Sequence, residues 1–269
     1  MRGPVAPELP VFIHVPKTAG STLNAALFAH HAAGHPALPL LRTLPGGLRD
    51  NSVLLRRLGP SVAEGVPHIG HYEGDPARMT GLLRQASWVS GHIQRRRFAS
   101  FLEEAGRIPR WVSLIRDPTE QVASHYQWWI EIHDRGWLRF RRYPAFFRQL
   151  SADIRAADNN DPKAVIHFLA LHHTLFLNLQ ADYLMPDGRE TSVEDMPAAL
   201  ADFAGLGLGS DIAPAFRAMT GAEAPPLPRR NTSRSAFDRA VFRTERMRAF
   251  LAEHNALDER LWALAGGRG

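Results

Sequence analysis

Apolar and polar residues alternate along the first half of the chain between short strand-like runs and helix-like stretches. Residues 11–15, 87–92 and 110–115 have the pattern of short strands; the second ends in polar residues, and the last is the clearest. Apolar residues recur at helical spacing from Ser21 onward, over 76–85 and over 98–105. Strands that alternate with helices predict an α/β fold with a mainly parallel, doubly wound sheet.

The remainder of the chain has a different pattern. Residues 34–70 are rich in Gly and Pro, which predicts loops with short helical pieces. From Lys163 the pattern is mostly helical and ends in a helical stretch over 235–264, with a break near His254 and Asn255. We therefore expect one domain covering 1–269, with a helix-rich C-terminal half.

Residues 116–120, Arg-Asp-Pro-Thr-Glu, carry three signals for the start of a helix. Asp117 suits the N-cap, Pro118 the first helical position and Glu120 the third. Apolar and aromatic residues follow at helical spacing as far as His133. The sequence predicts a helix that begins directly after the clearest strand.

The composition narrows the kinds of partner and chemistry. A net charge of +5 and a pI near 10.2 suggest an anionic partner, which leaves nucleic acid, an acidic polysaccharide and a nucleotide open. Cysteine is absent, which excludes disulfides, thiolate zinc sites and a cysteine nucleophile. The first ten residues lack a secretory pattern, and polar residues interrupt the longest apolar region, 164–185. We expect a cytoplasmic protein with no membrane span.

Residues 16–22, Pro-Lys-Thr-Ala-Gly-Ser-Thr, form a turn between the first strand and its helix. A helix N-terminus presents unpaired N–H groups and a partial positive charge, which favours an anion. Lys17 adds a full charge, and small residues let the backbone approach a ligand. The expected phosphate cradle consists of Lys17, Thr18, Ala19, Gly20, Ser21 and Thr22. The alternative is an ordinary connection in which Ser21 is the N-cap.

This turn is not a Walker A loop. That motif needs Gly, four residues and then Gly-Lys-Ser/Thr. Val15 stands where the first glycine belongs, and Ser21 follows Gly20 where the lysine belongs. The departure from the magnesium-binding layout points away from ATP hydrolysis.

Arg116 is a second candidate anion anchor. Ligands of open α/β sheets bind outside the carboxyl ends of the strands, where both Lys17 and Arg116 are expected. Ser124, on the helix that follows, could face the same crevice. Two such anchors suit a ligand with two separated phosphate-like groups, although an arginine before Asp-Pro can also be structural.

At these two motifs the chain resembles the sulfotransferases. "PKTAGSTL" resembles their 5′-phosphosulfate loop, and "VSLIRDPTEQVASHY" resembles their 3′-phosphate motif. The resemblance implies that Arg116 and Ser124 bind the 3′-phosphate of 3′-phosphoadenosine 5′-phosphosulfate (PAPS). The likeness is closest to the carbohydrate branch that includes heparan sulfate 2-O-sulfotransferases. "NLQADYL", from Asn178, and "HNALDERLW", from His254, are weaker echoes of that branch.

The resemblance also implies a general base. In this branch a histidine after a glycine, at the end of a middle strand, takes the proton of the acceptor hydroxyl, and "SGHIQ" matches it at His92. A neutral imidazole suits that role near neutral pH. The heparan sulfate enzymes carry a second histidine two residues earlier, where this chain has Ser90, which weakens transfer of the specific acceptor. Glu73 and His71 are the next candidate bases.

Basic residues near these motifs are further candidates. Arg95, Arg96 and Arg97 follow His92 and either guide an acidic acceptor or form a solvated face. The family often closes a late basic loop over the cofactor, which here matches Arg230, Thr232 and Arg234. The remaining histidines lack metal-ligand spacing, so no metal is expected.

The leading expectation is a PAPS-dependent sulfotransferase that uses Lys17 and His92 in catalysis. The family likeness implies an acceptor hydroxyl on a saccharide or glycoconjugate. A nucleotide-dependent kinase and a basic RNA-binding protein are the alternatives. No RNA-binding module is recognisable in the sequence, so nucleic acid is not the expected partner.

Overall fold

The computed structural model describes residues 8–31, 65–66, 69–133, 140–141, 143–225 and 237–267. The chain divides into two compact units, each made of two segments. The sheet unit comprises Met1–Ile115 and Gln180–Leu227, and the helical unit comprises Arg116–Leu179 and Pro228–Gly269. The expectation of a single domain stays a prediction.

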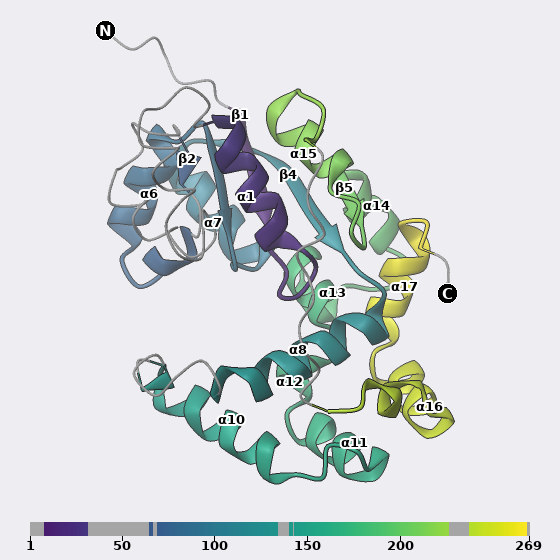
Figure 1. Ribbon diagram of the computed structural model, residues 1–269. Coiled ribbons are helices and arrows are strands. Elements are labelled where there is room, and N and C mark those ends of the chain that lie inside the picture. The colour runs from purple at the N-terminus through teal and green to yellow at the C-terminus, as the bar shows by residue number, and fades with distance from the viewer. Residues whose placement is uncertain are drawn as a thin grey trace, which may run out of the picture. The chain divides into compact units, whose positions relative to one another are not determined.

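The sheet unit contains a five-stranded sheet (Figure 1). Its strands are β1 (Glu8–Ile13), β2 (Gly65–Val66), β3 (Trp88–Gly91), β4 (Ile108–Ile115) and β5 (Phe203–Leu208). Their order across the sheet is β2-β3-β1-β4-β5, and every neighbouring pair is parallel. The α/β class and the parallel sheet are thereby confirmed.

Helices cover both faces of this sheet. Phe12 and Val112 point to one face and share a buried cluster with Leu27 of α1 (Gly20–His31) and Phe216 of α15 (Ala213–Thr220). Trp111 points to the other face, where its ring meets Phe98 of α7 (Arg95–Ala105) edge-on. This alternation along the strands makes the sheet doubly wound. The other elements of the unit are η1 (Ile69–Tyr72), α6 (Pro76–Gln85), α13 (Leu179–Leu184), η2 (Gly188–Glu190) and α14 (Met196–Ala201).

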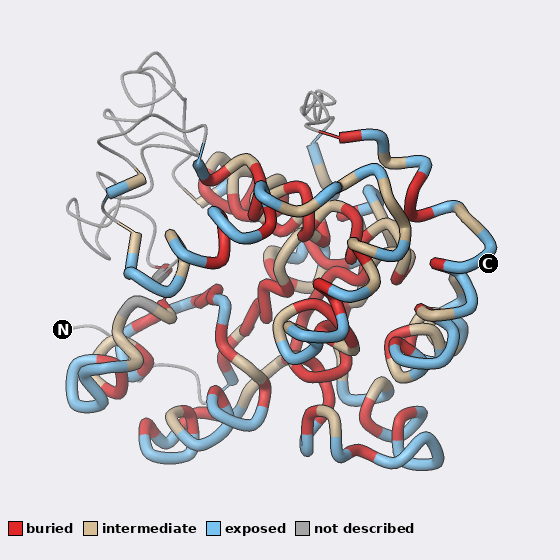
Figure 2. The backbone as a smooth tube through the Cα atoms, turned by 90° about the horizontal axis from the view of Figure 1, so that it is seen from below, coloured by how far each residue is buried: buried red, intermediate tan, exposed pale blue. Residues whose placement is uncertain are grey.

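The helical unit packs around an aromatic core. Tyr126 is fully buried, and its ring contacts Phe168, Phe176, Phe237 and Phe242 at centroid distances of 5.6–6.1 Å. The helices alternate buried and exposed residues along their length, as Figure 2 shows. They are α8 (Pro118–His133), α10 (Ala145–Ala156), α11 (Pro162–Leu171), α12 (His173–Phe176), η3 (Arg239–Arg243), α16 (Glu245–His254) and α17 (Ala256–Leu264). The prediction of a helix-rich second half is confirmed.

Several predicted boundaries hold because they rest on local signals. Helix α8 begins at Pro118, and the Asp117 carboxylate accepts a hydrogen bond from the backbone N–H of Glu120 at 2.8 Å. The predicted break in the last helix falls at Asn255, between α16 and α17. Three expectations need correction: α7 begins at Arg95, three residues before the predicted start, and neither β2, in the region predicted as loops, nor β5 was expected. No helix in the described ranges is both long and apolar enough to cross a bilayer.

Candidate functional site

The turn between β1 and α1 has an unusual backbone. Lys17 and Ala19 adopt left-handed conformations, with φ values of 69° and 67°. A left-handed conformation costs a residue with a side chain about 1–2 kcal/mol, so two of them in one turn store strain of a kind that clusters at ligand sites.

The same turn presents hydrogen-bond donors. Within the described ranges, no acceptor pairs with the backbone N–H groups of Thr18, Ala19, Gly20 or Ser21. These donors lie at the N-terminus of α1, where the helix dipole favours negative charge. Backbone N–H groups in such a turn form a concave site for an anion.

Two threonines of the turn have different surroundings. The Thr18 side chain is fully buried, and its hydroxyl donates to the Val15 carbonyl at 2.9 Å. This hydroxyl holds the turn together, so Thr18 can offer a ligand only its backbone N–H. The N–H of Thr22 already donates to the Ala19 carbonyl at 2.8 Å, which leaves its half-buried hydroxyl for an anion.

Gly20 packs so closely against the ring of His14 that a larger residue would not fit there. A Cβ atom built on Gly20 would lie 2.1 Å from Cδ2 and 2.3 Å from Nε2 of His14. His14 follows β1 directly and is 4% exposed, so its ring has little room to move away. The sequence interpretation assigned this glycine to ligand approach; the structure adds that it packs against His14.

His92 follows β3 directly and has the geometry of a proton acceptor. Its Nδ1 lies 2.6 Å from the backbone carbonyl of His14. A carbonyl oxygen can only accept, so Nδ1 carries the hydrogen and Nε2 keeps its lone pair. The side chain is exposed. Because β3 and β1 are parallel neighbours with Gly91 opposite Ile13, His92 and the turn leave the same edge of the sheet.

The residues near His92 narrow the choice of base. Ser90 is fully buried on β3, so it presents no exposed group at this edge. Glu73 forms an ion pair with Arg97 at 3.1 Å. Burial, with contributions from Asp182 and Glu73, raises the pKa of Tyr183 to about 12, so this phenol stays protonated at neutral pH. The side chain of His71 lies outside the described residues.

Arg95 does not fit the role predicted for it. Its side chain is buried, pairs with Asp202 and donates to the Ala199 carbonyl at 3.0 Å. Its guanidinium also lies over the rings of Trp111 and Phe203, 5.6 and 5.5 Å from their centroids. Arg95 therefore fastens α7 to α14 and the sheet and is not available to an acceptor, contrary to the prediction.

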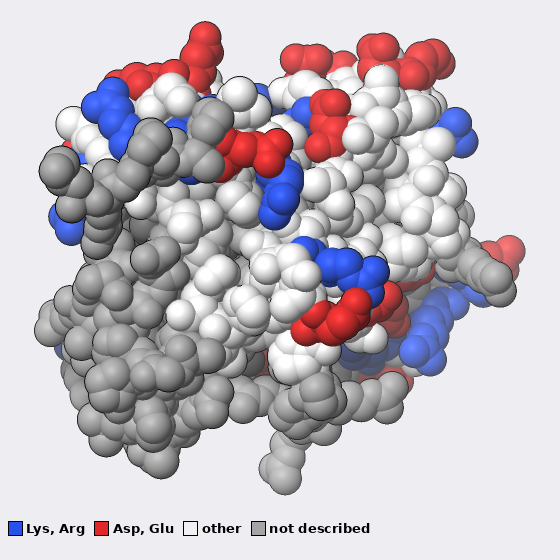
Figure 3. Space-filling view, turned by 90° about the horizontal axis from the view of Figure 1, so that it is seen from above, with Lys and Arg blue, Asp and Glu red and all other residues white. Residues whose placement is uncertain are grey.

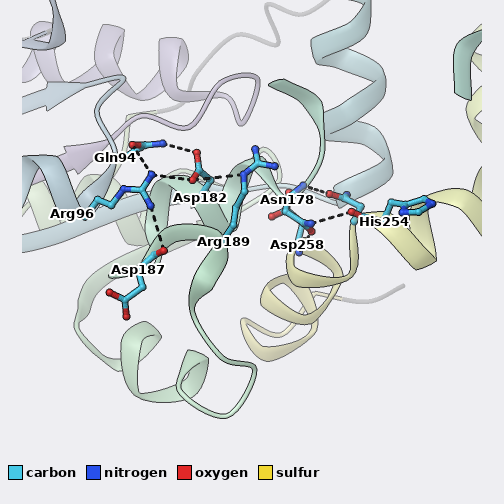
Figure 4. Close-up of polar contacts among 9 residues, drawn as sticks. Gln94, Arg96, Asn178, Asp182, Asp187, Arg189, His254 and Asp258 are labelled. Carbon is cyan, nitrogen blue, oxygen red and sulfur yellow. Dashed lines mark hydrogen bonds and ion pairs between the residues drawn. The ribbon is translucent and has the colours of Figure 1, made fainter. Parts of the chain in front are cut away.

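Arg96 is held at the surface by a polar network around Asp182 (Figure 4). Its guanidinium donates to the Asp187 carbonyl at 3.3 Å and to Gln94 at 3.2 Å, and lies 3.5 Å from the Asp182 carboxylate. The Gln94 amide donates to Asp182 at 2.5 Å, and Arg189 lies 3.7 Å from the same carboxylate. Arg96 and Arg97 are both exposed and remain candidates for contact with an acceptor.

In the helical unit, Asn178, the first residue of one weaker sequence echo, contacts the start of the other (Figure 4). The Asn178 side chain donates to the His254 carbonyl at 3.0 Å and accepts from the backbone N–H of Leu257 at 3.0 Å. The Asn255 side chain in turn accepts from the Asn178 backbone N–H at 2.5 Å. Asn178 thus caps the first turn of α17. These contacts give the echoes a structural role.

Arg116 belongs to a cluster of charges in the helical unit. Glu120 lies 3.3 Å from Arg116, 3.1 Å from Arg239 and 3.9 Å from Arg243. Burial lowers the pKa of Arg116, Glu120 and Asp117 oppose that shift, and Arg239 adds to it. Three guanidinium groups thus surround the Glu120 carboxylate, and Asp117 adds a second negative charge near Arg116. Ser124 lies half-buried on α8.

Sequence reasoning missed Arg239 and Arg243, because they lie about 120 positions from Glu120 and no motif marks them. The predicted loop residues Arg230, Thr232 and Arg234 lie outside the described residues.

Charges elsewhere are mixed in sign. On the face drawn in Figure 3, basic and acidic side chains adjoin one another. In the sheet unit, one guanidinium nitrogen of Arg217 donates to both carboxylate oxygens of Glu223, at 2.6 and 2.8 Å. In the part of the chain with described side chains, no group of three or more His, Cys, Asp or Glu residues has the arrangement of a metal site.

No protein-family model matches the chain, and no curated protein matches it. A functional assignment therefore rests on the residues and the geometry of the turn, His92 and the Arg116 cluster.

Proposed function

We propose that the protein transfers a sulfuryl group from PAPS to a hydroxyl group of an acceptor, on a saccharide or glycoconjugate. The observation that carries the proposal is the turn before α1. It combines left-handed backbone at Lys17 and Ala19 with the N–H groups of Thr18, Ala19, Gly20 and Ser21, for which the described part of the chain provides no acceptor. Such a turn suits a tetrahedral anion at a helix N-terminus.

Each of the two sequence motifs has a proposed role. In the sheet unit, the turn binds the 5′-phosphosulfate, and Lys17 stabilises the charge that grows on the departing phosphate. In the helical unit, Arg116 and Ser124 bind the 3′-phosphate. The nearby Arg239 adds positive charge at the same place, since it shares Glu120 with Arg116. The family likeness adds Arg230, Thr232 and Arg234.

The proposed chemistry is an in-line displacement at sulfur. The acceptor oxygen forms a bond to sulfur while the bond from sulfur to the 5′-phosphate oxygen breaks, and that oxygen keeps the electron pair. Nε2 of His92 takes the proton of the acceptor hydroxyl. The geometry supports this because the His14 carbonyl holds the hydrogen on Nδ1. The products are the sulfated acceptor and adenosine 3′,5′-bisphosphate.

Transfer from radiolabelled PAPS to a panel of saccharides tests the proposal. Wild type should label at least one acceptor, and His92→Ala should lose about 10²- to 10⁴-fold in turnover while it binds adenosine 3′,5′-bisphosphate normally. His167→Ala is the matched control, because His167 is an exposed histidine on α11 of the helical unit. It should behave as wild type.

Other results would overturn parts of the proposal. Phosphorylation of an acceptor from ATP, with a strict need for Mg²⁺, would favour a kinase. Near-normal turnover of a stable His92→Ala variant would mean that another residue takes the proton. A variant that melts earlier and loses bisphosphate binding would give His92 a structural role.

A further inference from the structure

The ring of His14 lies between the base proposed for the reaction and the turn proposed to bind the donor. It stacks on the His92 ring, with a centroid distance of 3.9 Å and an interplanar angle of 29°. It also stacks on Phe12 at 5.5 Å and 17°. The close approach of Gly20 places the first residue of α1 against the same ring.

We infer that His14 is a positioning residue, whose ring fixes the orientation of the His92 imidazole and links it to the turn at Gly20. The inference rests on the proposed function, because it takes His92 as the base. His14 is buried, so it has no direct contact with an acceptor in this role.

Two contacts together define how the His92 ring lies. The bond from Nδ1 to the His14 carbonyl fixes one atom of the ring but leaves rotation about that point. The stacked His14 ring fixes the plane and so fixes the direction of the Nε2 lone pair. An exposed side chain would otherwise sample several rotamers. A misplacement of about 1 Å in a reacting group can cost about 10²-fold in rate.

The stack is anchored in the protein core. Phe12, the next-to-last residue of β1, is fully buried and belongs to the cluster beneath α1. The Gly20 backbone packs closely against Cδ2 and Nε2 of the His14 ring. Planarity at position 14 is therefore the property that matters for His92, and a phenyl ring should supply it.

The test compares two substitutions at position 14. His14→Ala removes the stacked ring and should lower turnover about 10- to 100-fold, with the dissociation constant for adenosine 3′,5′-bisphosphate changed less than about threefold. His14→Phe should restore turnover to within about threefold of wild type. His31→Ala is the control, because His31 stacks on Trp88 in the same unit at 5.3 Å and 18°. It should leave turnover unchanged.

A double-mutant cycle separates positioning from general support of the fold. If His14 acts through His92, His14→Ala should change turnover less than about threefold in the His92→Ala background. An equal loss in both backgrounds would overturn the inference. Turnover of His14→Ala within about threefold of wild type would overturn it as well.

A spectroscopic measurement needs no acceptor and keeps the two proposals apart. In protein labelled with ¹³C- and ¹⁵N-histidine, three-bond couplings report the χ1 angle of His92. They should show one rotamer in wild type and in His14→Phe, and an average over several rotamers in His14→Ala, which keeps the backbone carbonyl but lacks the ring. One rotamer in all three proteins would overturn the positioning role, whatever the reaction. A failure of bisphosphate binding and transfer, with the rotamer averaging present, would instead overturn the proposed function alone.

Discussion

Replacement of Ala19 by glycine tests the left-handed turn on which the proposed function depends. At a φ of 67°, the Ala19 side chain crowds its own backbone, which costs about 1–2 kcal/mol, whereas glycine adopts this conformation without that cost. Glycine also loosens the unfolded chain, which lowers stability by about 0.4–1 kcal/mol. The difference of these two effects predicts that Ala19→Gly leaves the free energy of unfolding unchanged or raises it by up to about 1.5 kcal/mol.

Ala25 provides the matched control for this substitution. It lies half-buried in the interior of α1, six positions along the same segment. An alanine-to-glycine change inside a helix lowers stability by about 1 kcal/mol. The two variants should therefore differ in the free energy of unfolding by about 1–2.5 kcal/mol.

Urea unfolding followed by circular dichroism measures both variants beside wild type. Equal slopes against urea concentration would show that the midpoints can be compared directly. If Ala19→Gly loses as much stability as Ala25→Gly, residue 19 is not left-handed and the argument for an anion cradle fails.

Two further predictions concern the turn and a half-buried histidine. Lys17→Ala should lower turnover more than affinity for adenosine 3′,5′-bisphosphate, because the charge that Lys17 stabilises grows in the transition state. An equal loss in turnover and affinity would contradict this role. Turnover of the wild-type protein should be unchanged by EDTA. Burial first, and then the neighbouring His30, lowers the pKa of His31 from 6.5 to about 4. Between these values the unfolded chain binds a proton that the folded protein does not, so stability should fall as the pH falls from 6.5 to 4. His31→Gln should flatten this dependence in urea titrations, and identical slopes would count against the burial of His31.

Local signals in the sequence predicted the helix starts, because a cap depends on residues within one turn. Asp117 and Pro118 predicted the start of α8 for this reason. Strand β5 escaped prediction because Gly205 and Gly207 weaken its strand pattern. Tertiary packing requires both glycines. A Cβ atom at Gly205 would lie 2.4 Å from the Cβ of Ala218, and a Cβ atom at Gly207 would lie 2.3 Å from the carbonyl oxygen of Asp211.

The candidate site likewise contains features that local sequence predicted and contacts that it did not. The position of the turn was predicted from its motif, since the strand, the turn and the helix are contiguous. The stack of His14 on His92 joins residues 78 positions apart, and spacing along the chain does not reveal such a contact. The burial of Arg95 was missed because a run of three arginines resembles a solvated face, whereas helical geometry turns the first of them toward Trp111.

Calorimetric titration with adenosine 3′,5′-bisphosphate and with AMP tests the central claim most directly. The two ligands differ in the 3′-phosphate that Arg116 and Ser124 are proposed to bind. A charge-assisted hydrogen bond contributes about 1.5–3 kcal/mol, so the bisphosphate should bind about 10- to 100-fold more tightly than AMP. Arg116→Ala should remove most of that preference and leave AMP binding nearly unchanged. Equal affinity of the wild-type protein for the two ligands would contradict the assignment of a PAPS-dependent sulfotransferase.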